Sequence, residues 1–101
     1  MESEPSGVSY RRQKSTGVLH LSGIVDIFEA TTLHEAARTA LEDDKANSLR
    51  LDLTHVERLD ISALQILLAL KAGVIAQGRS FGVTRLAPAP ETLLARLGIA
   101  L

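Results

Sequence analysis

The stretch LRLDLTHVERLDISALQILLALKAGVIAQG, residues 49–78, decides the fold of this chain. At its start Leu49, Leu51 and Leu53 alternate with polar residues, and this period of two is typical of a half-buried strand. Further along, the apolar residues follow the spacing of a helix instead. The stretch therefore predicts a buried strand, a short loop and a nearly all-apolar helix. The period changes at residues 60–62, and sites in α/β domains gather where a strand gives way to a helix.

Ser62 stands at the start of this predicted helix and has two interpretations. In the first, Ser62 is the helix N-cap, because Gln65 three residues later completes a capping box that satisfies free backbone N–H groups. In the second, its hydroxyl is a phosphorylation site, because those N–H groups and the positive end of the helix dipole would stabilise an added phosphate. The two roles are compatible with each other.

The rest of the chain predicts further strands and helices. Strands are expected over residues 8–14, 18–24 and 80–86. Thr32 and Glu35 fit a capping box at the start of a first helix, and a last helix follows Pro88 and stops at Gly98. The apolar stripe of the first helix is Leu33, Ala36, Ala37, Ala40 and Leu41. Strands alternating with helices imply an α/β fold with a mixed sheet of four to five strands.

Length and composition predict one domain with a single core. The chain has 101 residues, of which 46% are hydrophobic. Residues 1–7 are polar and are expected to form a disordered tail, which leaves residues 8–101 as the domain. The tail has no apolar region typical of a signal peptide. The longest apolar run, Ile66 to Leu70, is too short to cross a bilayer. We therefore expect a cytoplasmic location without direct membrane insertion.

Composition also argues against several kinds of site. Aromatic residues make up 3% of the chain and its net charge is −1, which disfavours nucleic acid as a partner. Without cysteine there is no disulfide, thiolate metal site or cysteine nucleophile. The histidines, His20, His34 and His55, lack the spacing of metal ligands, and we place the last of them in a loop. We therefore expect neither a cofactor nor a metal.

One side of the helix after Ser62 carries mostly small residues. They are Gln65, Ala69, Ala72, Gly73 and Ala76. Either this side packs tightly under the neighbouring helix, or it is exposed and flat and docks a partner helix beside Ser62. Gly73 costs about 1 kcal/mol in a helix interior relative to alanine, and the close approach of another backbone would be one reason for it.

A set of short motifs resembles the STAS domain family of bacterial anti-sigma factor antagonists, from about Val8 to Leu101. The motifs are Gly23-Ile24-Val25-Asp26, Leu51-Asp52-Leu53, Asp60-Ile61-Ser62-Ala63-Leu64, Gly78 and Leu97-Gly98. In that family the helix usually opens with Asp-Ser-Ser-Gly and the second serine is phosphorylated, a position that falls on Ser62. This chain departs from the pattern at Ile61, which replaces the first serine, and at Ala63, which replaces the glycine.

The resemblance implies a regulatory protein-binding module whose partner is an anti-sigma factor that is also a serine kinase of the ATPase type. Phosphorylation of Ser62 would switch the binding. The early Gly-x-x-Asp loop of the family would lie beside that serine. Taken together, the loop, the helix start and the small side make up the predicted partner-binding residues: Gly23, Asp26, Asp60, Ile61, Ala63, Gln65, Ala69 and Ala72.

Other readings remain open from the sequence. Stand-alone STAS domains also serve as constitutive adaptor subunits of chemosensory systems and lipid-transport ATPase complexes, in which Ser62 would be only a helix cap. An enzyme would need a pocket lined by Asp26, Asp60 and His55, and we prefer to assign Asp52 and Asp60 to turn and loop capping. We therefore expect no enzymatic activity. A weak homodimer is also left open.

Overall fold

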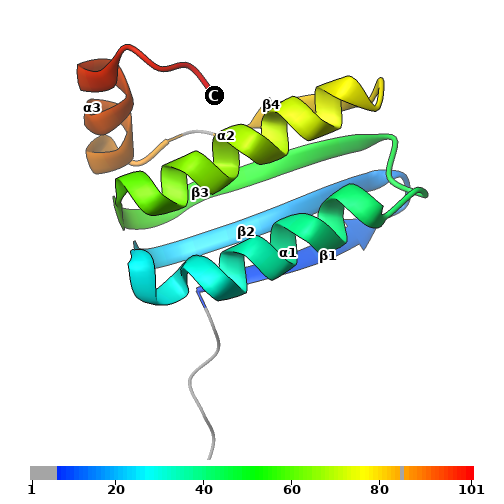
Figure 1. Cartoon of the computed structure of the whole chain (residues 1–101), viewed down its shortest axis with the longest axis horizontal. Coiled ribbons are helices and arrows are strands. Elements are labelled where there is room, and N and C mark those ends of the chain that lie inside the picture. The colour runs from blue at the N-terminus through cyan, green and yellow to red at the C-terminus, as the bar shows by residue number, and fades with distance from the viewer. Residues whose placement is uncertain (1–6, 85) are drawn as a thin grey trace, which may run out of the picture.

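The computed structural model describes residues 7–84 and 86–101, in which strands alternate with helices (Figure 1). The strands are β1 (Val8–Gln13), β2 (Thr16–Val25), β3 (Ser48–Leu59) and β4 (Ser80–Val83). The helices are α1 (Ala30–Glu42), α2 (Ile61–Ala76) and α3 (Pro88–Leu97), with a short 3₁₀ helix, η1 (Ile27–Glu29), before α1. The four strands lie in the order β1-β2-β3-β4; β1 is antiparallel to β2, and the other pairs are parallel. The predicted α/β fold with a mixed sheet is confirmed.

Part of the predicted tail and part of the predicted last strand lie outside the described residues. Residues 1–6 of the tail lie outside them, whereas the carbonyl of Gly7 accepts a 2.8 Å hydrogen bond from the backbone N–H of Ser22. The last strand was expected over residues 80–86. It ends at Val83, and residue 85 lies outside the described residues.

β3 is longer than the predicted strand because two bulges change its period. Its register against β2 shifts twice, and each shift places an additional residue on β3. As a result the buried residues Leu53, Val56 and Leu59 are three apart, yet all three face the core. A spacing of three inside a strand is not a strand signal, so the sequence placed His55 in a loop. That prediction is wrong, since His55 lies within β3.

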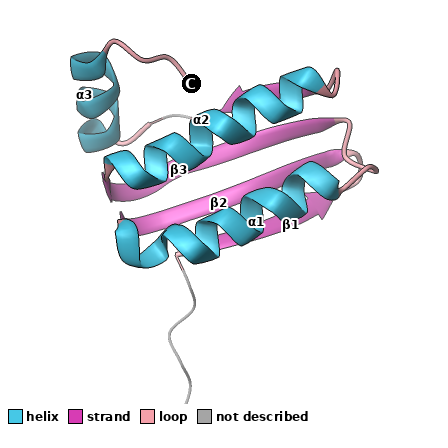
Figure 2. Cartoon of the chain, in the orientation of Figure 1, coloured by secondary structure: helices cyan, strands magenta, loops and turns pink. Residues whose placement is uncertain are grey.

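The core lies between the sheet and the two long helices. Figure 2 shows α1 and α2 side by side in front of the strands. The central leucines of β3, Leu49, Leu51 and Leu53, are fully buried there. From the helices, the buried side chains are Leu33, Ala37 and Ala40 of α1 and Ala63, Leu64, Leu67, Leu70 and Val74 of α2. The predicted stripe of the first helix is confirmed, with Ala36 and Leu41 half-buried at its margins.

The predicted start of the first helix is wrong. α1 begins at Ala30, directly after η1, and Thr32 lies inside it, so the capping box with Glu35 does not form. The cap is made earlier, by Asp26, whose Oδ1 accepts a 3.0 Å hydrogen bond from the N–H of Phe28. An aspartate in extended backbone before a helical turn is a strong N-cap, and here it starts the 3₁₀ turn that leads into α1.

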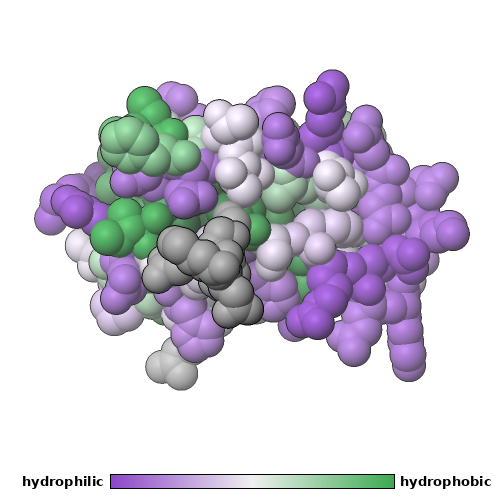
Figure 3. All heavy atoms as spheres, turned by 90° about the horizontal axis from the view of Figure 1, so that it is seen from below, coloured by the Kyte–Doolittle hydropathy of each residue, from purple (hydrophilic) through white to green (hydrophobic). Residues whose placement is uncertain are grey.

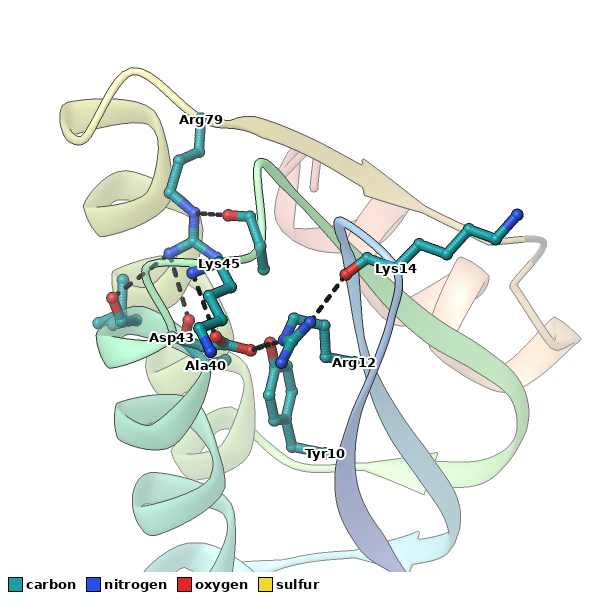
Figure 4. Close-up of polar contacts among 9 residues, drawn as sticks. Tyr10, Arg12, Lys14, Ala40, Asp43, Lys45 and Arg79 are labelled. Atoms are coloured by element: carbon teal, nitrogen blue, oxygen red, sulfur yellow. Dashed lines mark hydrogen bonds and ion pairs between the residues drawn. The ribbon is translucent and has the colours of Figure 1, made fainter.

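Arg79, directly before β4, fastens the far ends of the two helices (Figure 4). Its guanidinium donates to the carbonyl of Ala46 at 2.8 Å and to the carbonyls of Ala40 and Leu41 at 3.2 and 3.3 Å. The last carbonyls of a helix lack partners within the helix and carry partial negative charge. Arg79 therefore caps α1 and ties it to the loop before β3.

A second polar cluster joins β1 to the end of α1. The hydroxyl of Tyr10 donates to Asp43 Oδ2 at 2.7 Å, and Arg12 Nε lies 3.1 Å from the same oxygen (Figure 4). Burial raises the pKa of Tyr10 to about 12, with the hydrogen bond to Asp43 and its negative charge adding to the effect. The hydrogen bond from Tyr10 in turn holds the pKa of Asp43 below its usual value.

The C-terminal helix packs against the sheet. α3 contacts β3, buries Pro90 and Leu94 and ends at Gly98, whose left-handed backbone closes the helix as predicted. The tail then returns along α2, where Lys71 Nζ donates to the carbonyl of Ala100 at 3.3 Å. None of the helices within residues 7–84 and 86–101 has the length and apolar character needed to cross a membrane.

We expect Leu67→Ala to lower the free energy of unfolding by about 2–5 kcal/mol, because it leaves a cavity in the core. Urea unfolding followed by circular dichroism measures this. The matched control is Ile75→Ala on the same helix, where the side chain is 55% exposed and the loss should stay below about 1 kcal/mol. Equal losses in the two variants would contradict the assignment of the core.

We expect the Tyr10 cluster to make the protein less stable in alkali. A tyrosine in the unfolded chain titrates near pH 10, whereas Tyr10 in the folded chain titrates near 12. The folded state therefore favours the protonated phenol, and this stabilisation is complete below pH 10 and disappears as the pH rises towards 12. Urea unfolding between pH 9 and 12 should show a smaller fall for Tyr10→Phe than for the wild type; identical pH profiles would refute the coupling.

Candidate partner-binding site

Two aspartates meet at the edge of the sheet where β2 and β3 end. The strands are parallel, so their carboxyl ends lie together, and Asp26 and Asp60 are the residues that follow them. The backbone N–H of Asp60 donates to the carbonyl of Val25 at 3.2 Å. The two residues also line one small hollow. The Gly-x-x-Asp loop and the start of α2, far apart in sequence, therefore form one surface.

Asp60 is the N-cap of α2, so the predicted capping box of Ser62 and Gln65 is wrong. Asp60 has extended backbone, and its Oδ1 accepts a 3.0 Å hydrogen bond from the N–H of Ala63. Ser62 lies inside the first helical turn, where its side chain is not placed to cap. The prediction that Asp60 caps through the backbone is confirmed, and Ser62 is left without a capping role.

Ser62 faces a groove between the two long helices. The groove has a volume of about 470 Å³. Its lining is His34, Ala37, Arg38 and Leu41 from α1 and Ser62, Gln65, Ile66, Ala69 and Leu70 from α2. Ser62 is half-buried, and within the described residues its hydroxyl has no hydrogen-bond partner. Its oxygen is therefore not engaged in holding the fold.

Exposed apolar side chains surround the same edge. Phe28 is 89% exposed and Ile27 64%, and they follow directly on the cap at Asp26. Ile24 and Ile61, which flank the two aspartates, are 53% and 57% exposed. Figure 3 shows apolar surface at the left of this face, the end at which η1 and the start of α2 lie in Figure 1. We call these four residues the apolar patch.

Sequence reasoning found only one residue of the apolar patch, Ile61. Ile24 was predicted only as part of a strand, and neither Ile27 nor Phe28 was among the predicted partner-binding residues. The sequence does contain a signal for Ile27 and Phe28 as surface residues. They are two large apolar residues directly after Asp26, in a segment too short to bury them. Contiguous exposed apolar residues of this kind mark interaction surfaces.

The other predicted partner-binding residues divide into accessible and inaccessible ones. On the small side, Gln65, Ala69 and Ala72 are exposed. Ala63 is fully buried, so its side chain cannot reach a partner, because the first helical turn points it into the core. Gly23 is half-buried next to the apolar patch and has a φ of +69°, a conformation that favours glycine.

Gly73 belongs to the contact between the helices rather than to an exposed face. A Cβ at this position would lie 2.9 Å from Cδ2 of Leu41 on α1. The close approach expected from the glycine is present, although a side chain makes it and not a backbone. The small side therefore packs under α1 at this one position and is exposed elsewhere.

The acidic residues do not form one cluster. Asp52 lies within β3, where its Oδ2 is 2.8 Å from Nδ1 of His20 and its Oδ1 accepts from Thr84 Oγ1 at 3.1 Å. Burial works to raise the pKa of Asp52, but the hydrogen bonds from Thr54, Thr84 and His20 outweigh it and hold the pKa below its usual value. His55 lines a different hollow from Asp26 and Asp60. The three residues that an enzyme was expected to need are thus not brought together.

The comparisons with known proteins agree with this geometry. A family model described as "Mlab, STAS domain" matches residues 8–100. The chain belongs to the STAS domain family. No curated protein sequence matches it significantly. In this STAS domain the early loop lies beside the start of α2, as the resemblance implied.

Solved structures of anti-sigma factor antagonists share the fold. One from Mycobacterium paratuberculosis is 26% identical, with 90% of this chain and 76% of that chain covered and a TM-score of 0.79. The Bacillus cell fate determinant SpoIIAA in its phosphorylated form is 14% identical, with 91% and 84% covered and a TM-score of 0.73. SpoIIAA in its unphosphorylated form is 13% identical, with 87% and 81% covered and a TM-score of 0.71.

We expect Asp60→Ala to lower the free energy of unfolding by about 1 kcal/mol, because it removes the cap of α2. Ser62→Ala is the matched control two residues away and should change it by less than about 0.5 kcal/mol. Urea unfolding of both variants measures the difference. A larger loss in Ser62→Ala than in Asp60→Ala would return the capping role to Ser62.

Proposed function

We propose that this STAS domain is a regulatory protein-binding module, that its partner docks on the apolar patch, and that phosphorylation of Ser62 switches the docking. The observation that carries the proposal is the exposed apolar patch, Ile24, Ile27, Phe28 and Ile61, at the edge where α2 begins. Ile61 directly precedes Ser62, whose hydroxyl bonds to no described residue. The proposed partner is an anti-sigma factor that acts as a serine kinase of the ATPase type. The role requires no catalysis by this chain.

The exposure of Phe28 supports docking. Leaving an aromatic side chain 89% exposed forgoes about 2 kcal/mol of burial free energy that folding could have gained. A partner that covers the patch recovers this free energy. Aromatic residues near the centre of an interface commonly contribute most of the binding.

The surroundings of Ser62 support a switch by charge. In the transfer, Ser62 Oγ forms a bond to the γ-phosphorus of ATP, the bond from that phosphorus to ADP breaks, and the hydroxyl proton passes to a base of the kinase. The product carries a charge of about −1.5 to −2. Asp26 and Asp60 already place negative charge at this edge, so the added charge opposes an apolar or acidic partner surface.

A fixed adaptor is the second candidate function. The matching family model, described as "Mlab, STAS domain", favours it, as do Ile61 and Ala63 in place of the serine and glycine that the antagonists usually carry. In that case the chain would be a constitutive subunit of a lipid-transport ATPase complex or a chemosensory system. The apolar patch would serve both functions, and only the dependence on Ser62 separates them.

The test is a pull-down from native cells with five baits, followed by mass spectrometry of the retained proteins. The baits are the wild type, Ser62→Ala, Ser62→Asp, Phe28→Asp and the control Ile75→Asp, which places the same charge at an exposed apolar residue at the other end of α2. We expect the wild type, Ser62→Ala and Ile75→Asp to retain a serine-kinase ATPase. Ser62→Asp and Phe28→Asp should each lose at least about 30-fold.

Each contrary result has a definite meaning. Equal retention of one partner by the wild type and Ser62→Asp, with loss in Phe28→Asp, would make the domain a fixed adaptor. Full retention by Phe28→Asp would remove the apolar patch as the docking surface. Circular dichroism of each bait checks that the fold is unchanged.

A further inference from the structure

We propose that Arg38 and His34 of α1 form an internal receptor for a phosphate on Ser62, so that phosphorylation links the two helices across their groove. The inference deepens the proposed function and rests on Ser62 being the modified residue. It adds a consequence that charge alone does not supply: the phosphate is held by the domain itself, on the side away from the sheet edge.

The first support is geometric. α1 and α2 start at the same end of the molecule and run in the same direction (Figure 1), because each follows one of two parallel strands. Arg38 and His34 are four residues apart, so they share one face of α1. That face lines the groove that Ser62 lines from α2. Four polar side chains from two helices therefore border one hollow: His34 and Arg38 from α1, and Ser62 and Gln65 from α2.

The second support is that these groups have no other partner. Within the described residues, neither Arg38 nor His34 has a hydrogen bond or an ion pair through its side chain, and neither does Ser62. Only two of the other described arginines are engaged: Arg12 pairs with Asp43, and Arg79 binds carbonyl groups at the C-terminal end of α1. The cation beside the groove is thus available to a new anion.

The chemistry of the two side chains fits a phosphate monoester. The planar guanidinium of Arg38 presents paired N–H donors that match two phosphate oxygens. The imidazole of His34 supplies at least one N–H donor whether it is neutral or protonated. A phosphoserine offers three acceptor oxygens, so it has acceptors for both side chains.

The charges around Ser62 direct the phosphate towards α1. On the side of the sheet edge lie the carboxylates of Asp26 and Asp60, with Glu29 at the end of η1. These acidic groups outnumber the one guanidinium that lines the same hollow, that of Arg58. On the side of α1 lie Arg38 and His34, with Glu35 as the neighbouring acidic residue. An anion attached to Ser62 is repelled from the edge and attracted into the groove.

Closing the groove changes the surface that is exposed to a partner. Apart from Gln65, its remaining lining is apolar and consists of Ala37, Leu41, Ile66, Ala69 and Leu70. A phosphate that joins Ser62 to Arg38 covers this surface and fixes α1 against α2 at their open end. The modified domain therefore presents a charged, closed surface beside the apolar patch.

The test is a double-mutant cycle on protein that carries phosphoserine at position 62, installed by genetic encoding so that no kinase is needed. The wild type and Arg38→Gln are compared with and without the phosphate by thermal unfolding. We expect Arg38→Gln to lower the melting temperature by about 4 °C more in the phosphorylated form than in the unphosphorylated form. The control, Arg50→Gln, removes an exposed arginine of β3 and should act equally in both forms.

A second measurement detects the contact directly. In ¹⁵N NMR spectra the side-chain Nε–H signal of Arg38 should shift on phosphorylation, while that of Arg50 stays in place. Equal effects of Arg38→Gln in both forms, together with an unshifted Arg38 signal, would overturn the receptor. These outcomes are independent of the proposed function: phosphorylated wild type that still binds the partner would refute the switch but not the receptor, and phosphorylated Arg38→Gln that still fails to bind would leave the switch intact.

Discussion

The parallel pairing of β2, β3 and β4 is the constraint on which the rest of this structure depends. Parallel strands require crossover connections, so α1 and α2 both return over the sheet and both begin at the edge where β2 and β3 end. That edge carries Asp26 and Asp60 on one surface, and Ser62 follows Asp60 by two residues in the groove between the helices. The site is therefore a product of topology, and no single segment contains it.

The contacts between the helices are unevenly distributed, and this leaves the site end open. At the far end, Arg79 binds the last carbonyls of α1 and Leu41 packs onto Gly73. At the near end, the groove separates Ser62 from Arg38, and no hydrogen bond between described residues crosses it there. A domain held firmly at one end can carry an adjustable contact at the other without a loss of global stability.

Much of the fold followed from local patterns. Alternating leucines in β3, helical spacing in α1 and α2 and the glycine after α3 act over a few residues, and a sequence displays them directly. Two features were not predicted: one depends on pairing with another segment, and the other on which of two local caps, Asp26 or Thr32, starts the helix. The bulges of β3 convert a period of two into a period of three, and the start of α1 is set by the cap at Asp26 and the turn that follows it.

The sequence by itself determined the α/β class, the STAS family and the importance of the segment around Ser62. Only the tertiary structure decided the roles of the residues there. Asp60 and Ser62 both fit an N-cap, and the extended backbone at Asp60 selects it. Phe28 and Arg38 resemble ordinary loop and surface residues in the sequence. The fold leaves Phe28 89% exposed and places Arg38 in the groove that Ser62 also lines. Composition and spacing report local preference, whereas a shared surface depends on contacts between distant segments.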